Sequence, residues 1–298
     1  MYLTGFADEA ADDIKGQIMA TRLLGWKNIE ARTINGKTIA QLSEKEFEVV
    51  EQELKKANIK INCLASTIAN WQKTVLDPLE DDLREARKLI PRMKKLNIPM
   101  VRIMSYAPLR NEQGNILDNQ EEDEVFRRLN IISRMFQEEG IIPVHENCMT
   151  YGGMSWQNTQ NLLTNVPSLK LVFDTGNPIV LAVETHKLKH CVLERVSWDF
   201  YQQVREHIIY VHIKDVIFNQ KSNKLIYTYP GEGQANIRKI LRDLISHGYE
   251  GGLSIEPHME VVFHDPSRQS TDQARLKNYI QYGNRLMKIL EEISDYSK

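Results

Sequence analysis

Cysteine is scarce in this sequence, and its placement argues against two kinds of cysteine site. The three cysteines, Cys63, Cys148 and Cys191, lie far apart, and none belongs to a Cys-x-x-Cys pair. An odd number of separated thiols argues against a disulfide framework and against a thiolate zinc site. We therefore expect the protein to work in a reducing compartment, and we predict the cytoplasm.

Long apolar runs and a strong charge of one sign are also missing. The chain has no run of apolar residues long enough to span a membrane, and its first residues, MYLTGFADEA, do not have the pattern of a secretion signal. With 38 basic and 40 acidic residues, the formal net charge is only -2. This balance predicts no binding to nucleic acid or to an anionic membrane, and it suits a small, nearly neutral substrate.

The sequence does contain a repeated alternation of short apolar runs and longer segments with helical spacing. Ser43 opens a capping box, for example, and Phe47, Val50 and Leu54 then mark one face of a helix. Such alternation predicts parallel β/α units. Eight runs predict strands, at residues 2–7, 28–32, 60–66, 100–106, 141–147, 169–174, 208–214 and 252–257.

The predicted architecture is a single (β/α)8 TIM barrel with eight parallel strands. A chain of 298 residues has the usual length for this fold, and no linker rich in Pro, Gly or Ser divides it. We therefore expect residues 1–298 to form one domain. Pro91 is expected to kink or interrupt the helix before the fourth strand. The long sixth connection, residues 176–207, is expected to carry a short extra helix over the barrel mouth.

Four consecutive predicted strands each end in a carboxylate or an imidazole. These residues are Glu146, Asp174, His212 and Glu256. The C-terminal ends of barrel strands converge on one opening, where three carboxylates would repel one another unless a cation joined them. Each group alone is more often satisfied by a backbone amide or a neighbouring cation, but their succession on four strands favours one divalent metal. Oxygen-rich ligation favours Mn²⁺, with Mg²⁺, Co²⁺ or Zn²⁺ as alternatives.

The same segments resemble the xylose isomerase-like barrel superfamily, in particular its sugar phosphate isomerase/epimerase branch. The resemblance covers nearly the whole chain and is carried by the motifs VHEN, VFDTGN, VHIKD, PGEGQ and SIEPH. It implies that Glu146, Asp174, His212 and Glu256 bind one divalent metal, and that Glu146 and Glu256 are the catalytic acid/base pair. The implied reaction isomerises or epimerises a sugar or sugar phosphate by proton transfer through a metal-bound enediolate.

Two other activities and a noncatalytic role remain as alternatives. The same intermediate can expel a β-hydroxyl group, as in an inosose dehydratase-like lyase. An endonuclease IV-like phosphodiesterase would need further metal ligands, whereas the third and fourth strands end near Ser66 and Ser105, and the net charge is not basic. A barrel that binds a sugar without catalysis is less favoured because all four expected ligands are present.

Further polar residues near the strand ends are candidates for substrate binding. Lys214 shares a side with His212 and either stabilises an anionic oxygen or pairs with Asp215 or a ligand carboxylate. The full set of candidates is Lys214, Arg32, Glu30, Asn177 and His258. Glu30 and Arg32 point the same way and either reach the substrate or pair with each other.

The Gly-Glu-Gly of residues 231–233 lacks a P-loop lysine, so it is expected to form a flexible loop near the metal. A homodimer is one expectation for the assembly, because symmetric dimers are the most frequent oligomers of soluble proteins.

Overall fold

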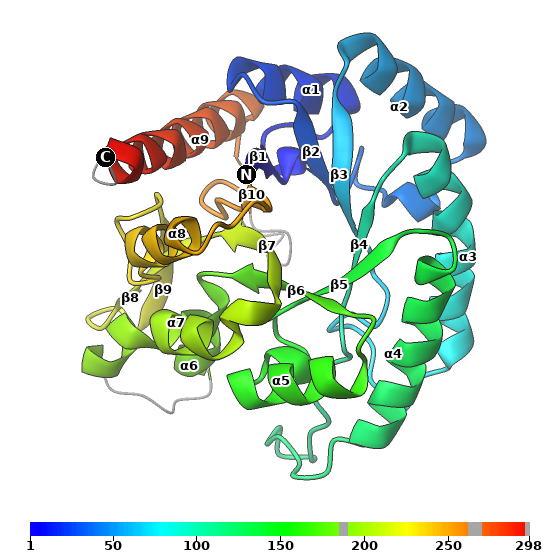
Figure 1. The fold of residues 1–298 in the computed structure, drawn as a ribbon, viewed down its shortest axis with the longest axis vertical. Coiled ribbons are helices and arrows are strands. Elements are labelled where there is room, and N and C mark those ends of the chain that lie inside the picture. Colours follow the sequence, from blue (N-terminus) through cyan, green and yellow to red (C-terminus); the bar gives the residue numbers. More distant parts are fainter. Residues whose placement is uncertain (185–189, 262–269, 296–298) are drawn as a thin grey trace.

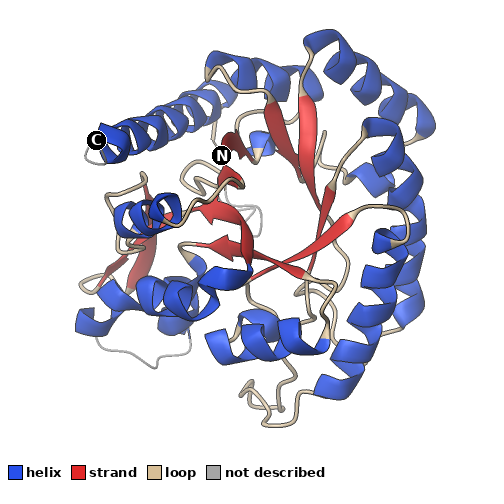
Figure 2. Cartoon of the chain, in the orientation of Figure 1, coloured by secondary structure: helices blue, strands red, loops and turns tan. Residues whose placement is uncertain are grey.

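A ring of eight parallel strands forms the centre of the molecule, with helices around it (Figures 1 and 2). The computed structural model describes residues 1–184, 190–261 and 270–295. The sheet order is β1-β10-β7-β6-β5-β4-β3-β2, and a bridge between Phe6 and Glu30 links its two edges. The predicted (β/α)8 barrel is thereby confirmed. Its strands are β1 (Tyr2–Gly5), β2 (Asn28–Ala31), β3 (Lys60–Ala65), β4 (Met100–Ile103), β5 (Ile142–Glu146), β6 (Lys170–Asp174), β7 (Ile208–Ile213) and β10 (Gly252–Ile255).

Helix α2 (Glu44–Ala57) begins and ends where its sequence predicts. In α2 the Ser43 side chain accepts a hydrogen bond from the Glu46 N–H, and the Glu46 side chain accepts one from the Ser43 N–H. Asn58 ends this helix in the left-handed conformation, with a φ of 55°. The long helices are α1 (Ile14–Leu23), α2 (Glu44–Ala57), α3 (Leu79–Leu96), α4 (Glu122–Gln137), α5 (Trp156–Asn165), α7 (His190–Val204), α8 (Ile237–Ser246) and α9 (Asp272–Asp295). Among the described residues, no helix is both long and apolar enough to cross a membrane.

Helix α3 runs through Pro91 without interruption, so of the two expected effects of this proline only a kink remains a prediction. Proline cannot donate to the carbonyl four residues earlier, that of Arg87. Pro91 lies on the exposed side of the helix, so water can hydrate this carbonyl. On the opposite side, Leu89 and Met93 are fully buried and hold the helix against the barrel.

Two elements over the barrel mouth complete the fold. Helix α6 (Asn177–Glu184) is the short extra helix expected in the sixth connection. The antiparallel hairpin of β8 (Asp215–Asn219) and β9 (Lys224–Thr228) was not predicted, and it follows β7 after a single residue, Lys214.

A buried carboxylate fastens this hairpin to the loop that follows it. The Asp215 carboxylate accepts backbone N–H bonds from Gly231, Gly233 and Ala235 at 2.8, 2.9 and 3.1 Å, and another from Val216 at 3.0 Å. Gly231 has a φ of +82°, and a Cβ at Gly233 would overlap the carboxylate. The Gly-Glu-Gly segment, expected to be a flexible loop, is therefore held by hydrogen bonds.

Replacing Asp215 by Ala should destabilise the protein, because buried N–H groups would lose their acceptor. We expect the free energy of unfolding to fall by about 3 kcal/mol in urea denaturation. The control is Asp199→Ala, which removes a half-exposed carboxylate 3.5 Å from Arg195 and should cost less than about 1 kcal/mol. Equal stability of the two variants would show that Asp215 does not anchor the loop.

Candidate metal centre

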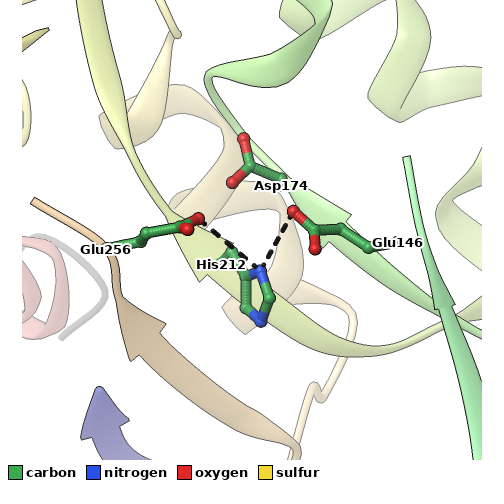
Figure 3. Close-up of side chains that lie close together, drawn as sticks. All are labelled: Glu146, Asp174, His212 and Glu256. Carbon is green, nitrogen blue, oxygen red and sulfur yellow. Dashed lines mark ion pairs between the residues drawn. The ribbon is translucent and has the colours of Figure 1, made fainter. Parts of the chain in front are cut away.

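The four predicted ligands converge at the C-terminal mouth of the barrel. Glu146 ends β5, Asp174 ends β6, His212 lies in β7, and Glu256 follows β10. One ligand atom from each lies within 4.8 Å of the others, and all four residues are buried. Figure 3 shows Glu146 and Glu256 reaching in from opposite sides of His212. The Nδ1 atom of His212 lies 3.3 Å from Glu146 Oε1 and 3.9 Å from Glu256 Oε2.

Strand register explains this convergence. Asp174 and Ser254 each lie opposite His212 in the neighbouring strands. Side chains two residues apart in a strand point to the same side, so Glu256 continues the row of Ser254 just as Lys214 continues that of His212. The sequence therefore places His212 one layer deeper in the barrel than Glu256 and Lys214.

Cationic side chains surround the carboxylates. Arg102, on β4, donates to Glu146 Oε2 at 2.5 Å. Lys214 Nζ lies 3.0 Å from both Asp174 Oδ2 and Glu256 Oε2. Lys214 thus pairs with ligand carboxylates, one of its two expected roles, and its pairing with Asp215 is not seen.

The pKa values of the ligands reflect this charge arrangement. Burial opposes ionisation of Glu146, yet Arg102 and His212 hold its pKa at about 2. Burial raises the pKa of Asp174 to about 7 although the Lys214 cation opposes the rise, and the Glu256 and Glu146 carboxylates add to it. Burial disfavours the His212 cation, but the Glu30 and Glu146 carboxylates raise its pKa to about 10.

The donor set fits a divalent cation. Nδ1 of His212 is buried and makes no hydrogen bond, although two carboxylates face it. A positive charge must lie between these groups, and either a proton on His212 or a metal ion supplies it. Three carboxylates and one imidazole suit Mn²⁺, Mg²⁺ or a similar ion. We propose that Glu146, Asp174, His212 and Glu256 are the ligands.

Glu30 lies beneath this cluster and does not line the cavity. Its Oε1 is 3.1 Å from His212 Nε2, and its Oε2 accepts a 2.8 Å hydrogen bond from the Tyr210 hydroxyl. The side chain is fully buried. The expected substrate contact of Glu30 is therefore replaced by a contact with His212, and we propose that Glu30 fixes the orientation of this ring.

Arg32 lines the cavity and is held by carboxylates from the chain after β1. It pairs with Asp8 at 2.9 and 3.0 Å, and with Glu9 and Glu256 at 3.3 Å each. Glu30 is not among these partners, so the expected Glu30–Arg32 pair does not form. Sequence reasoning missed Asp8 and Glu9, although two adjacent acidic residues directly after a strand were a visible signal.

His258 and Asn177 contact the two glutamates. Glu9 holds His258 through its backbone N–H at 2.8 Å and through Nδ1 at 2.9 Å, which leaves Nε2 3.4 Å from Glu256 Oε1. His258 has a φ of 53°, an uncommon value for a non-glycine residue. The Asn177 side chain donates to Glu146 Oε1 at 3.0 Å.

These residues line one cavity at the barrel mouth, with an empty volume of about 630 Å³. Its polar wall comes from strand ends and its apolar wall from the segments beyond them. Arg102 was missed, although a charged residue inside an apolar strand was a signal that it faces the polar interior. The lining residues are Arg32, Trp71, Arg102, Glu146, Cys148, Met149, Asn177, Val180, Glu184, Lys214, Leu225, Tyr227, Glu256 and His258.

Comparison with known proteins agrees with this architecture. A family model described as "Xylose isomerase-like TIM barrel" matches residues 20–279. The chain belongs to this family. Among solved structures, a D-tagatose 3-epimerase-like protein superposes with a TM-score of 0.71 at 14% identity and full coverage of both chains. A xylose isomerase-like TIM barrel protein from Mycobacterium smegmatis, in complex with magnesium, has a TM-score of 0.69 at 17% identity, covering 98% of this chain and 97% of that one.

Curated relatives of this family member have a higher sequence identity than these structures, over shorter matched lengths. An inosose dehydratase from Lactiplantibacillus plantarum is 24% identical over 234 residues, or 74% of each protein. Another from Clostridium tetani is 22% identical over 175 residues, and this match spans 57% of each protein. The chain thus covers little more than half of the length of the second relative.

Metal binding should stabilise the folded protein, because the carboxylates converge on one point only in the folded state. Mn²⁺ at a hundred times its Kd should raise the free energy of unfolding by about 2.7 kcal/mol, and EDTA should reverse the gain. Asp174→Asn should lose most of it, whereas the surface control Asp199→Asn should keep it. An equal gain in both variants, measured by thermal unfolding, would contradict the ligand assignment.

Replacing Glu30 by Gln should weaken metal binding without removing a ligand. A neutral amide is a weaker acceptor for the His212 Nε2–H, so the ring is less firmly oriented. We expect Mn²⁺ affinity, measured by calorimetry, to fall about 10- to 100-fold. The control Glu80→Gln changes an exposed carboxylate paired with Arg87 and should leave the affinity unchanged. Unaltered affinity in Glu30→Gln would refute the positioning role.

Proposed function

We propose that this protein is a divalent-metal-dependent enzyme that isomerises or epimerises a sugar-like polyhydroxy carbonyl compound. The observation that carries the proposal is the convergence of four buried ligand side chains in which two glutamates face each other across the site (Figure 3). The likeness to a D-tagatose 3-epimerase-like protein supports it. The ion is proposed to be Mn²⁺, and the magnesium of the Mycobacterium smegmatis protein makes Mg²⁺ an alternative.

The two glutamates are proposed to move the proton. A bound divalent ion supplies Lewis acidity that makes a C–H bond beside a carbonyl more acidic. Glu146 is held ionised by Arg102 and oriented by Asn177, so it can accept a proton from one face of the substrate. Lys214 and Arg32 likewise keep Glu256 ionised on the other face, and its pKa lies well below the usual range although burial opposes this. Return of the proton by Glu146 to the neighbouring carbon gives an isomer. An epimer forms when Glu256, after taking a proton from a substrate hydroxyl or from water, delivers it to the opposite face of the same carbon, and Glu146 then releases its proton to water.

Lys214 and Arg32 are proposed to stabilise negative charge on substrate oxygens. Lys214 Nζ lies 3.0 Å from two carboxylate oxygens and lines the cavity, within which a substrate oxygen would bind. Burial and water exclusion strengthen such contacts relative to those in bulk water. Asn177 and His258 are proposed to hydrogen-bond substrate hydroxyls, since both line the cavity beside the glutamates.

A dehydratase is the second candidate, favoured by the two inosose dehydratase relatives. Loss of water requires a proton donor for the departing hydroxyl in addition to the base. The His258 ring meets this requirement in geometry, because Glu9 holds Nδ1 and Nε2 lies beside Glu256. A phosphodiesterase is less favoured, because β4 contributes Arg102 to the cavity where a further metal ligand would be needed.

Deuterium exchange separates these reactions. Mn²⁺-loaded protein is incubated in D₂O with ketoses, their phosphates and inososes, and proton NMR follows the carbon beside the carbonyl. Exchange with a new sugar establishes isomerase or epimerase chemistry, and exchange with loss of water establishes the dehydratase. No exchange across the panel would overturn the proposal.

The proton-transfer role predicts the behaviour of glutamine variants. Glu146→Gln and Glu256→Gln should each slow deuterium exchange by at least about 100-fold, because an amide cannot accept the proton. Metal content is measured in parallel, since both residues are also proposed ligands. Glu80→Gln is the matched surface control. Unchanged exchange with full metal content in both variants would remove the glutamates from the mechanism.

A further inference from the structure

The hairpin that follows β7 gives the cavity part of its apolar wall. Side chains alternate along a strand, and in β9 Leu225 and Tyr227 are half-buried whereas Lys224 and Ile226 are exposed. Leu225 and Tyr227 line the cavity, and Ile226 does not. One face of β9 therefore looks into the site, and the other faces solvent.

The hairpin is held firmly enough to present a side chain at a defined place. Asp215 fastens its first residue to the loop at Gly231, Gly233 and Ala235. The Gln234 side chain accepts from the Phe218 N–H at 2.8 Å, and the Gln234 N–H donates to the Val216 carbonyl at 2.9 Å. These hydrogen bonds fix β8 close to β7, the strand that carries His212. Pairing with β8 then fixes the position of β9 and of the side chains that it presents to the cavity.

Tyr227 lies against the polar side of the cavity. Its ring meets the His258 ring edge to face, with centroids 5.2 Å apart and an interplanar angle of 81°. Within the described part of the chain its hydroxyl makes no hydrogen bond. Burial raises the pKa of Tyr227, and the Glu256 and Asp174 carboxylates add to the rise although Lys214 opposes it, so the hydroxyl is protonated and able to donate.

We propose that Tyr227 is a specificity-determining residue that binds the substrate beside His258, where the apolar wall of the cavity meets the proposed metal cluster. Its ring packs on substrate C–H groups and its hydroxyl bonds a substrate hydroxyl. Trp71, Met149 and Val180 complete the apolar wall, so the cavity selects a ligand with oxygens on one side and C–H surface on the other. This inference rests on the proposed function, because it places a polyol carbonyl compound at the metal cluster.

The first test is Tyr227→Ala, with Ile226→Thr as the matched control on the opposite face of the same strand. For the substrate identified by deuterium exchange, Tyr227→Ala should raise KM roughly tenfold or more and change kcat less, with Mn²⁺ affinity unchanged. Ile226→Thr should keep both constants within about twofold. A KM within about twofold of wild type in Tyr227→Ala, or a loss of Mn²⁺ affinity that shows a merely structural role, would overturn the proposal.

The second test uses Tyr227→Phe, which keeps the ring and the fold. Wild type should discriminate against one monodeoxy analogue of the substrate, altered away from the carbonyl, and Tyr227→Phe should lose that discrimination while retaining the others. Equal discrimination in both proteins would refute the hydroxyl contact. If wild type turns over no polyol carbonyl compound, the proposed function fails and this inference fails with it. Turnover with an insensitive Tyr227 overturns the inference alone.

Discussion

The rest of the site depends on one electrostatic constraint, the crowding of buried carboxylates at the barrel mouth. Around the mouth, the described residues place six carboxylates, Asp8, Glu9, Glu30, Glu146, Asp174 and Glu256, against three permanent cations, Arg32, Arg102 and Lys214. Uncompensated buried charge is costly, so the excess of negative charge must be met by protons on histidine or by a metal ion. Each cation touches a proposed metal ligand, so fold stability and the charge state of the site are linked.

This constraint also organises the barrel below the mouth. Glu30 accepts from Tyr210, whose hydroxyl also meets the Asn62 amide, and Asn62 bonds the Thr4 hydroxyl. These contacts join β1, β2, β3 and β7 across the barrel interior. An apolar layer of Cys63, Met100, Val144 and Val172 packs with them and excludes water. The position of His212 is therefore determined by strands on the far side of the barrel as well as by its own.

The sequence predicted the parts of the site that depend on strand order and alternation. A charged residue after an apolar run identified each proposed ligand, and period-two spacing predicted that Lys214 shares the side of His212. The depth of a side chain along the barrel axis was not predictable, because it depends on how strand registers shift around the barrel. Glu30 was therefore expected to line the cavity, whereas it lies beneath it. The hairpin at residues 215–228 was missed although Val216, Phe218, Leu225 and Tyr227 alternate around an Asn-rich turn. The hairpin is inserted between β7 and the following helix α8, and the expectation of strict β/α alternation allowed no strands there.

The contrast between strands and loops also explains why activity is harder to predict than fold. The proposed metal cluster needs only four side chains at fixed strand ends, and such a cluster can serve proton transfer with or without loss of water. The reaction that follows depends on which groups stand beside the substrate. The residues proposed for this role are His258, Arg102 and Tyr227, which come from a connection, a strand interior and the hairpin. Strand ends therefore account for the proposed metal site, and the segments around them for the choice among the proposed reactions.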